Sequence, residues 1–358
     1  MGFKCGIVGL PNAGKSTIFN ALTQANATVA PYPFTTVDPN IGKVAVPDER
    51  LRALEELLKP KKVTPATLSF VDIAGLIKGA SKGEGLGNQF LSYIRDVDAI
   101  AHVVRCFVDP EVSHPYGEPD PQRDVETVTL ELILSDLELV ERRLEKLRKA
   151  ARVGPQELKK EVELLEELLK WLSEGKLARN FLRDIKDLPK DLPLITIKPY
   201  FYIANFSEGG EKYLNKLKEM ADREGVPLVE VNAKVELELF ELEPEEREQF
   251  RKELGLSEGA LLKVVKVGYG LLGLVTFYTT ANQDLRAWTV RQGTKAQEAA
   301  GMIHSDMQKG FIRAEVMRVE DLLALGSEHL VREKGLVRFE GRDYEVQDGD
   351  VIFFRFHI

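Results

Sequence analysis

Cysteine is rare in this sequence of 358 residues, and basic residues are fewer than acidic ones. The two cysteines, Cys5 and Cys106, lie in apolar strand-like runs, so we expect reduced core thiols and no cysteine metal site. The net charge of −8 argues against a general nucleic-acid-binding protein. No apolar run reaches the roughly 18 residues of a membrane span, and a core strand already begins at Lys4. We therefore expect a cytoplasmic protein without a signal peptide.

What the sequence does contain is a phosphate-binding motif near its start. Residues 9–17 read GLPNAGKST and match G-x-x-x-x-G-K-S. An apolar, β-branched run at residues 4–8 predicts a buried strand before the motif, and residues 18–22 predict a helix after it. This order of strand, loop and helix predicts a P-loop rather than a glycine-rich turn that binds nothing.

The chemistry of a P-loop assigns roles to its residues. Backbone N–H groups from Asn12 to Lys15 would surround the phosphates, together with the helix N-terminus. Lys15 would neutralise the β- and γ-phosphates, and Ser16 would ligate magnesium.

Further magnesium and phosphate ligands are predicted downstream. Residues 63–72 read VTPATLSFVD, a strand that ends at Asp72, and Gly75 completes a D-x-x-G motif. Asp72 would hold magnesium through water, and the Gly75 N–H would reach the γ-phosphate. The intervening loop, residues 32–40, offers the hydroxyls of Thr35 and Thr36. One of them would complete the magnesium shell, unless both are simply solvated.

The segment after Gly75 predicts slow hydrolysis. The five glycines from Gly75 to Gly87, counted with both ends, favour a switch that orders on the γ-phosphate. Leu76 stands where Ras-type enzymes have a water-orienting glutamine, so another group must position the water or hydrolysis is slow. His114, in a Pro- and Gly-bearing loop, is one candidate. The alternatives are an exposed histidine without a role, backbone groups, or a potassium ion ligated by Asn12.

Base recognition is predicted after the strand at residues 199–204. Guanine-specific proteins carry Asn-Lys-x-Asp there, whereas this chain has Asn205, Phe206, Ser207 and Glu208. The aspartate that accepts two hydrogen bonds from guanine is therefore missing. The Asn205 amide and the Phe206 backbone would instead form hydrogen bonds with adenine. ATP is favoured over GTP, with a relaxed site as the alternative. Residues 228–234 predict a last strand with its loop beside the base.

These motifs resemble the YchF/Obg-like ATPase family in order and spacing over essentially the whole chain. The resemblance implies ATP preference, slow intrinsic hydrolysis and association with ribosomes. It also implies that Ser16 and Thr36 ligate magnesium, and it supports His114 as the water-positioning group. The predicted nucleotide-binding residues are Asn12, Ala13, Gly14, Lys15, Ser16, Thr17, Gly75, Asn205, Phe206, Glu208, Asn232, Ala233 and Lys234, with Lys15 and His114 as catalytic residues and Ser16, Thr36 and Asp72 as magnesium ligands.

The fold class is predicted as α/β, with two further modules. Leucines and valines at three- and four-residue steps in residues 124–173 predict a helical hairpin, either a projecting coiled coil or a pair packed flat on the sheet. Residues 274–358 resemble a TGS domain, a ubiquitin-like β-grasp. We therefore predict a P-loop domain at 1–123 and 189–273, an inserted hairpin at 124–188, and a TGS domain at 274–358.

The sequence thus predicts a magnesium-dependent ATPase that acts as a switch on ribosomes, as a monomer and away from membranes. Potassium is a second candidate cofactor. An Obg-type GTPase and a nucleotide-gated adaptor whose turnover is incidental are the alternatives.

Overall fold

The computed structural model describes residues 2–24, 40–73, 86–151, 155–181, 187–189, 191–253 and 259–357. The chain divides into two compact units, which we describe separately. The larger unit contains Phe3–Gly42 and Ser69–Gly268. The smaller unit contains Met1–Gly2, Lys43–Leu68 and Tyr269–Ile358.

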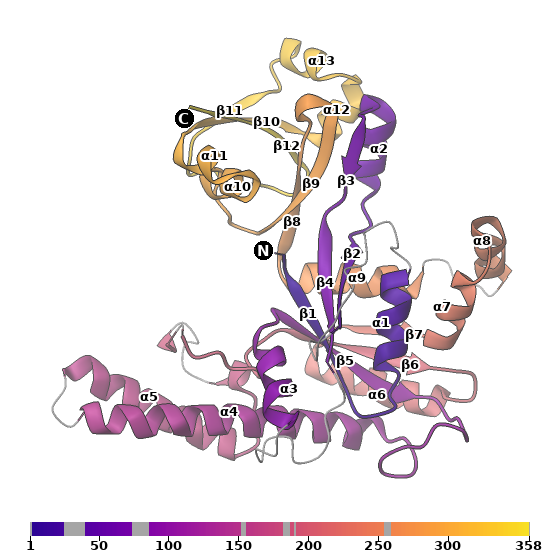
Figure 1. Ribbon diagram of the computed structural model, residues 1–358, viewed down its shortest axis with the longest axis vertical. Coiled ribbons are helices and arrows are strands. Elements are labelled where there is room, and N and C mark those ends of the chain that lie inside the picture. The colour runs from indigo at the N-terminus through magenta and orange to yellow at the C-terminus, as the bar shows by residue number, and fades with distance from the viewer. Residues whose placement is uncertain are drawn as a thin grey trace. The chain divides into compact units, whose positions relative to one another are not determined.

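A six-stranded sheet organises the larger unit, and its strands from β4 to β7 in the sheet order are parallel (Figure 1). Its strand order is β2-β4-β1-β5-β6-β7, and β1 pairs in parallel with β4 and β5, β5 with β6, and β6 with β7. The carboxyl ends of β4, β1, β5, β6 and β7 therefore lie at one edge of the sheet, where ligands bind in open α/β folds. The strands are β1 (Lys4–Val8), β2 (Asn40–Ala45), β4 (Thr67–Asp72), β5 (Ala99–Cys106), β6 (Tyr200–Phe206) and β7 (Leu228–Val231).

Continuous burial explains why these strands read as apolar runs in the sequence. All residues of β5 are buried, as parallel strands covered on both faces require. Residues of α3, α4 and α6 pack against the strands in two core clusters, which contain Ile100 and Val104 of β5. The helices are α1 (Lys15–Gln24), α3 (Leu86–Arg95), α4 (Pro121–Ala151), α5 (Gln156–Ser173), α6 (Glu211–Glu224), α7 (Ala233–Phe240), α8 (Pro244–Glu253) and α9 (Ala260–Leu271), with a 3₁₀ turn at Ala178–Asn180.

Helices α4 and α5 lie side by side (Figure 1). The first part of α4 packs on the sheet through Val128 and Leu132. Its later part shares a separate cluster with α5, for example Leu144 with Leu165. The described members of that cluster come from helices and connecting segments rather than from strands. The predicted helical pair is therefore present, and a coiled-coil geometry stays a prediction.

The smaller unit is built on a mixed sheet with strand order β11-β10-β12-β8-β9-β3. The pairs β10–β11, β10–β12 and β8–β9 are antiparallel, whereas β12–β8 and β3–β9 are parallel. Helix α10 packs on one face of this sheet, through Ala296, Ala299 and Ala300. That the unit is a TGS-type β-grasp stays a prediction. Its elements are α2 (Glu49–Leu58), β3 (Lys62–Thr64), β8 (Leu274–Thr279), β9 (Asp284–Arg291), α10 (Ala296–Ile303), α11 (Ser305–Lys309), β10 (Phe311–Arg318), α12 (Val319–Leu325), α13 (Glu328–Glu333), β11 (Arg338–Glu340) and β12 (Asp350–Phe356), with a 3₁₀ turn at Ala281–Gln283.

The compact units differ from the predicted domains in residues 43–68. The predicted boundaries assign this segment to the P-loop domain, but it packs with the C-terminal strands instead. Leu51 and Leu54 of α2 share a core cluster with Tyr278 and Leu285, because the apolar side of α2 is covered there. Asp48 caps α2 by accepting hydrogen bonds from the Arg50 and Leu51 N–H groups.

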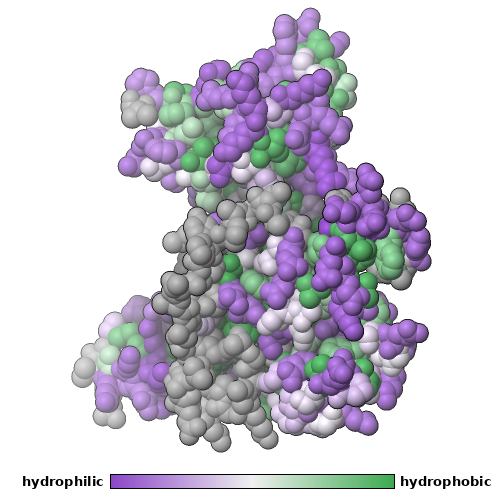
Figure 2. Space-filling model, turned by 45° about the vertical axis from the view of Figure 1, so that its right-hand side comes forward, coloured by the Kyte–Doolittle hydropathy of each residue, from purple (hydrophilic) through white to green (hydrophobic). Residues whose placement is uncertain are grey.

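Burial and surface character agree with the composition. Cys5 and Cys106 are both buried and free, which confirms the predicted core thiols, and burial raises the pKa of both. No helix in the described residues has the length and apolar character needed to cross a membrane. Hydrophilic residues predominate on the face in Figure 2, and hydrophobic ones form small groups.

Candidate nucleotide-binding site

The predicted P-loop follows β1, which has the predicted bounds Lys4–Val8, and it leads into α1. Gly14 has φ +92°. A Cβ atom there would lie 2.1 Å from Nδ2 of Asn205, so only glycine fits. Asn12 also has a positive φ, 62°. The loop therefore takes a tight, left-handed path that brings α1 directly to the edge of the sheet.

Lys15 lies inside this loop rather than in solvent. It is 7% exposed, and its Nζ donates a hydrogen bond to the Leu10 carbonyl at 2.8 Å. Burial lowers the pKa of Lys15 to about 8, although the charge of Asp72 acts in the opposite direction. The ammonium group is thus held at the centre of the loop by a carbonyl that a phosphate oxygen would replace.

Asn205 joins two of the predicted segments at the end of β6. Its Nδ2 donates to the Ala13 carbonyl at 3.0 Å, and its Oδ1 accepts from the Ala233 N–H at 3.3 Å. The side chain is buried, at 6% exposure. We predicted that this amide would pair with adenine. In the structure both of its ends are occupied by backbone groups, so Asn205 fixes the P-loop to the loop after β7.

A cavity of about 780 Å³ lies between these loops. Phe206, half-buried, and Lys234, exposed, contribute to its wall. Asn232 caps α7, since its Oδ1 accepts from the Val235 N–H at 3.2 Å. The lining residues are Asn12, Gly14, Lys15, Ser16, Thr17, Phe107, Val108, Asp109, Val112, Asn205, Phe206, Ser207, Asn232, Ala233, Lys234, Leu237, Glu238 and Glu241.

Some predicted site residues do not line this cavity. Glu208 is exposed and stands outside its lining. Ala13 is buried beneath the loop, where its carbonyl meets Asn205. Thr36 and Gly75 lie outside the described residues, as do Thr35 and Leu76.

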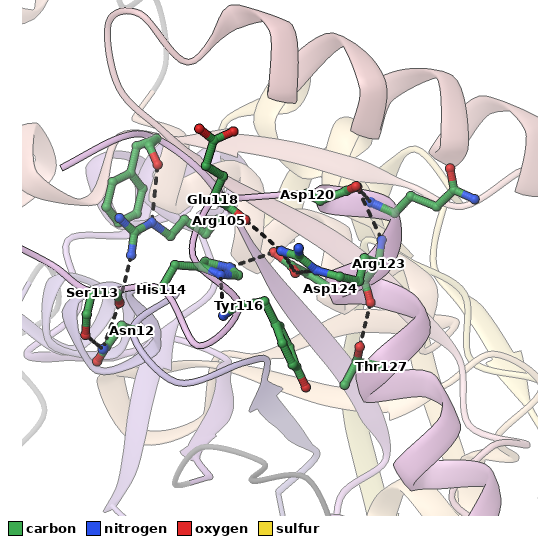
Figure 3. A network of polar contacts seen from close by, with 12 residues as sticks. Asn12, Arg105, Ser113, His114, Tyr116, Glu118, Asp120, Arg123, Asp124 and Thr127 are labelled. Carbon is green, nitrogen blue, oxygen red and sulfur yellow. Dashed lines mark hydrogen bonds and ion pairs between the residues drawn. The ribbon is translucent and has the colours of Figure 1, made fainter. Parts of the chain in front are cut away.

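His114 points toward Asp124 at the start of α4 (Figure 3). Its Nε2 lies 2.9 Å from Oδ2 of Asp124, and its Nδ1 accepts from the Tyr116 N–H at 3.1 Å. The His114 side chain is 2% exposed and does not line the cavity. The alternative of an exposed loop histidine is therefore wrong, and a water-positioning role requires the ring to leave Asp124.

Ser113, which the sequence analysis did not identify, connects the same loop to the P-loop. The Ser113 carbonyl accepts from Nδ2 of Asn12 at 3.0 Å and from Nη1 of Arg105 at 3.2 Å. Arg105 itself is 3% exposed at the end of β5. The position of this loop after a parallel strand was the available signal, since such loops meet at one edge.

The carboxylate of Asp72 fits a magnesium site. Asp72 ends β4 and is 9% exposed, and its Oδ1 is buried without a hydrogen-bond partner among the residues that the structure describes. A buried, unpaired carboxylate oxygen is a suitable ligand for a hard cation or its water. The hydroxyl-bearing residue Ser16 lines the cavity at the start of α1.

Comparison with known proteins gives two family matches. Residues 4–142 match the family described as a 50S ribosome-binding GTPase. Residues 274–357 match the C-terminal family of YchF-type GTPases, described as a protein of unknown function.

Full-length relatives are also found. The ribosome-binding ATPase YchF of Bacillus subtilis is 50% identical over 366 residues, and that of Haemophilus influenzae is 48% identical over 363, with both chains covered completely in each case. The solved structure of the Schizosaccharomyces pombe YchF GTPase superposes with a TM-score of 0.86 at 40% identity, covering 99% of this chain and 97% of that one. With such identity along its entire length and the same fold, the chain belongs to the YchF family.

Proposed function

We propose that this chain is a magnesium-dependent ATPase that associates with ribosomes and acts as a slow nucleotide switch. One observation carries the proposal: the P-loop and the loops after β6 and β7 enclose one cavity of about 780 Å³. The names of the bacterial relatives, ribosome-binding ATPases, support the choice of nucleotide and partner.

The phosphates would bind at residues 12–17, where backbone N–H groups meet the N-terminus of α1. Lys15 would exchange its bond to the Leu10 carbonyl for a phosphate oxygen. Because this lysine is already buried in the loop, little side-chain freedom is lost on binding.

Magnesium would be held by Ser16 and Asp72, with Thr36 as a further ligand outside the described residues. Bound there, the ion would neutralise charge on the β- and γ-phosphates. The protein's own part is to orient the Asp72 carboxylate at the end of β4.

The base would lie against Phe206 and beside Asn232, Ala233 and Lys234. Since the amide of Asn205 is used by backbone groups, the base edge would be read by backbone atoms of these loops. Glu208 is exposed and lies outside the lining of the cavity. Guanine would therefore lack the carboxylate that accepts its two hydrogen bonds in guanine-specific sites. ATP is accordingly preferred to GTP.

Hydrolysis would be slow because His114 must first leave Asp124. A potassium ion beside Asn12 is the alternative accelerating group. Exchanging sodium for potassium in the assay, with and without His114→Ala, separates the two.

Calorimetric titration with ATP, ADP and GTP tests the proposal. Lys15→Ala should abolish most binding of all three, whereas Lys218→Ala, which removes a surface lysine paired with Glu230, should not. Single-turnover ATP hydrolysis with and without ribosomes then tests the switch. Tighter binding of GTP than ATP, or full affinity in Lys15→Ala, would contradict the proposal.

A further inference from the structure

Arg105 is a buried charged residue at the end of β5 that has no role in the proposed function. It is 3% exposed, and its register partner on the neighbouring strand is Asn205 of β6. Register partners point to the same face of a sheet, and the Asn205 side chain reaches Ala13 in the P-loop. Two buried polar side chains therefore lie next to each other on the side of the sheet that the P-loop covers.

The guanidinium group of Arg105 binds main-chain carbonyls of one loop, residues 107–113. Nε donates to the Phe107 carbonyl at 3.2 Å, Nη2 to the Val112 carbonyl at 2.9 Å, and Nη1 to the Ser113 carbonyl at 3.2 Å. The group also lies over the Phe107 ring, 4.3 Å from its centroid. Each of its three nitrogens is therefore bonded to the loop that follows its own strand.

Carbonyls rather than carboxylates compensate this buried charge. The charges of Asp109 and Asp124 act on the guanidinium group through space, but Asp124 forms its ion pairs with His114 and Arg123. A buried charge that loses its hydrogen bonds is costly, so the three carbonyls stay in place as long as Arg105 is buried. The arginine thus imposes one shape on the loop.

The loop that Arg105 holds is a wall of the nucleotide-binding cavity. Phe107, Val108, Asp109 and Val112 line this cavity together with residues of the P-loop and of α7, whereas Arg105 does not line it. Arg105 therefore acts on the cavity through the loop and not by direct contact with what the cavity holds.

The same loop is bonded to the P-loop at Ser113. The Ser113 carbonyl accepts from Arg105 and also from Nδ2 of Asn12, at 3.0 Å (Figure 3). The Ser113 hydroxyl lies 3.4 Å from the same Nδ2. One carbonyl therefore connects the end of β5, the wall of the cavity and the P-loop.

We propose that Arg105 is a positioning residue for the nucleotide, which determines the affinity for ATP and ADP by holding residues 107–113 against the P-loop. This inference rests on the proposed nucleotide-binding function. Arginine is required because its planar group presents three nitrogens in a fixed arrangement that matches three carbonyls. Lysine would keep the charge, but it carries all its donors on one nitrogen.

Turnover should depend on Arg105 less than binding does. His114 follows Ser113 in the chain, but its own hydrogen bonds, to Asp124 and to the Tyr116 N–H, do not involve Arg105. A residue that contributes equally to binding in the ground state and the transition state changes KM and leaves kcat unchanged.

Calorimetry with ATP and ADP and steady-state ATP hydrolysis by Arg105→Lys test the proposal. We expect the Kd of both nucleotides to rise at least about tenfold, the scale of one hydrogen bond to a charged group. Because hydrolysis is slow, KM for ATP should rise in parallel, while kcat at saturating ATP should change less than about threefold.

A merely structural defect would give a different result, because a smaller folded fraction lowers kcat and leaves KM unchanged. Arg179→Lys is the matched control. Arg179 also donates to a carbonyl, that of Thr196 at 3.1 Å, and also lies over a ring, 4.0 Å from the centroid of Tyr200, but outside the lining of the cavity. It should bind both nucleotides with wild-type affinity.

Two further variants keep the proposal testable if Arg105→Lys folds poorly. Arg105→Met removes the charge as well as the bonds and should lose at least as much affinity as Arg105→Lys. Asn12→Gly tolerates the positive φ of 62° at this position and removes only the bond to Ser113 from the exposed side, so it should also raise both Kd values.

Wild-type affinity in Arg105→Lys would overturn the proposal, whether or not Arg105→Met loses affinity, because the shape of the guanidinium group would then be irrelevant. A lower kcat at unchanged KM in Arg105→Lys, or unchanged Kd values in Asn12→Gly, would overturn it as well. If Lys15→Ala abolishes ATP binding while Arg105→Lys binds normally, only the role of Arg105 is wrong. If the wild type does not bind ATP, the proposed function itself is wrong.

Discussion

Asn205 holds two segments of the candidate site together through backbone groups. Its carboxamide connects Ala13 in the P-loop to Ala233 at the start of α7. Both partners are backbone groups of buried residues, with Ala13 at 2% and Ala233 at 1% exposure. The side chain therefore fixes the distance between the P-loop and the start of α7, the two segments that would contact the phosphates and the base in the proposed complex.

Replacing Asn205 with alanine should weaken ATP, ADP and GTP alike. The substitution leaves a buried carbonyl and a buried N–H unpaired, at roughly 1–3 kcal/mol each. We expect the affinity for all three nucleotides to fall at least tenfold, together with the thermal stability. Calorimetry on Asn205→Ala measures this. If the affinity for ATP fell much more than the affinity for GTP, Asn205 would instead contact the base directly.

The contact between His114 and Asp124 predicts a second effect. Asp124→Asn keeps the shape of the carboxylate but removes its charge, and neutral hydrogen bonds are about half as strong as charge-assisted ones. His114 should then leave α4 more readily, and single-turnover ATP hydrolysis should become several-fold faster at unchanged ATP affinity. Asp124 is a positioning residue here, because it acts only through the histidine.

The control is the same change in a His114→Ala background. There Asp124→Asn should have no effect on hydrolysis, because the group it restrains is gone. If the rate rises equally in both backgrounds, Asp124 acts by another route, such as its bonds to Arg123.

Sequence alone could place Lys15 and Ser16, because a P-loop is a continuous motif whose backbone geometry its glycines determine. It could not predict the role of Asn205, whose partners lie 192 and 28 positions away. It could not predict the contact between His114 and Asp124 either, since a loop rich in proline and glycine does not indicate which carboxylate it packs against. Contacts between strand ends depend on register, which the sequence pattern does not specify.

Glu315 of strand β10 has a buried carboxylate that accepts hydrogen bonds from Arg355 and Arg332, and these bonds lower its pKa against the effect of burial. The stability of the smaller unit should therefore depend on pH. The folded-state pKa of Glu315, about 2, is below its ordinary value of 4.5. The resulting stabilisation is complete above pH 4.5, decreases as the pH falls, and is lost at about pH 2. The shift corresponds to about 3 kcal/mol at neutral pH.

Urea unfolding of the wild type and of Glu315→Gln between pH 7 and pH 3 measures the free energy of unfolding of both proteins and tests this pH dependence. The variant should be less stable than the wild type at pH 7, and the difference should shrink as the pH approaches 3. Glu333→Gln, at an exposed position of α13, is the control and should show no such convergence. A constant difference across this pH range would mean that Glu315 contributes by shape rather than by charge.

For the chain as a whole, the sequence pattern identified the elements better than their grouping. Residues 43–68 read as part of the nucleotide-binding domain because they lie between two of its motifs. The apolar residues of α2 and the edge of β3 give no indication of which sheet they join. Their partners, on β8 and β9, follow more than 200 residues later: Asp48 to Tyr278 alone spans 230.

This grouping predicts the outcome of cutting the chain at the expected boundary. A protein that ends at residue 273 retains residues 43–68 but loses β9, with which Lys62–Thr64 pair, and the side chains that cover Leu51 and Leu54. The segment should then be exposed and readily cleaved by trypsin after Arg50, Arg52 or Lys62, whereas the full chain should resist cleavage there. Mass spectrometry of timed digests locates the cuts, and sites in Glu211–Glu224, within the larger unit, report whether that unit stays folded. Equal resistance of residues 43–68 in both proteins would show that the segment folds without the C-terminal strands, and that the boundary at 273 separates independent domains after all.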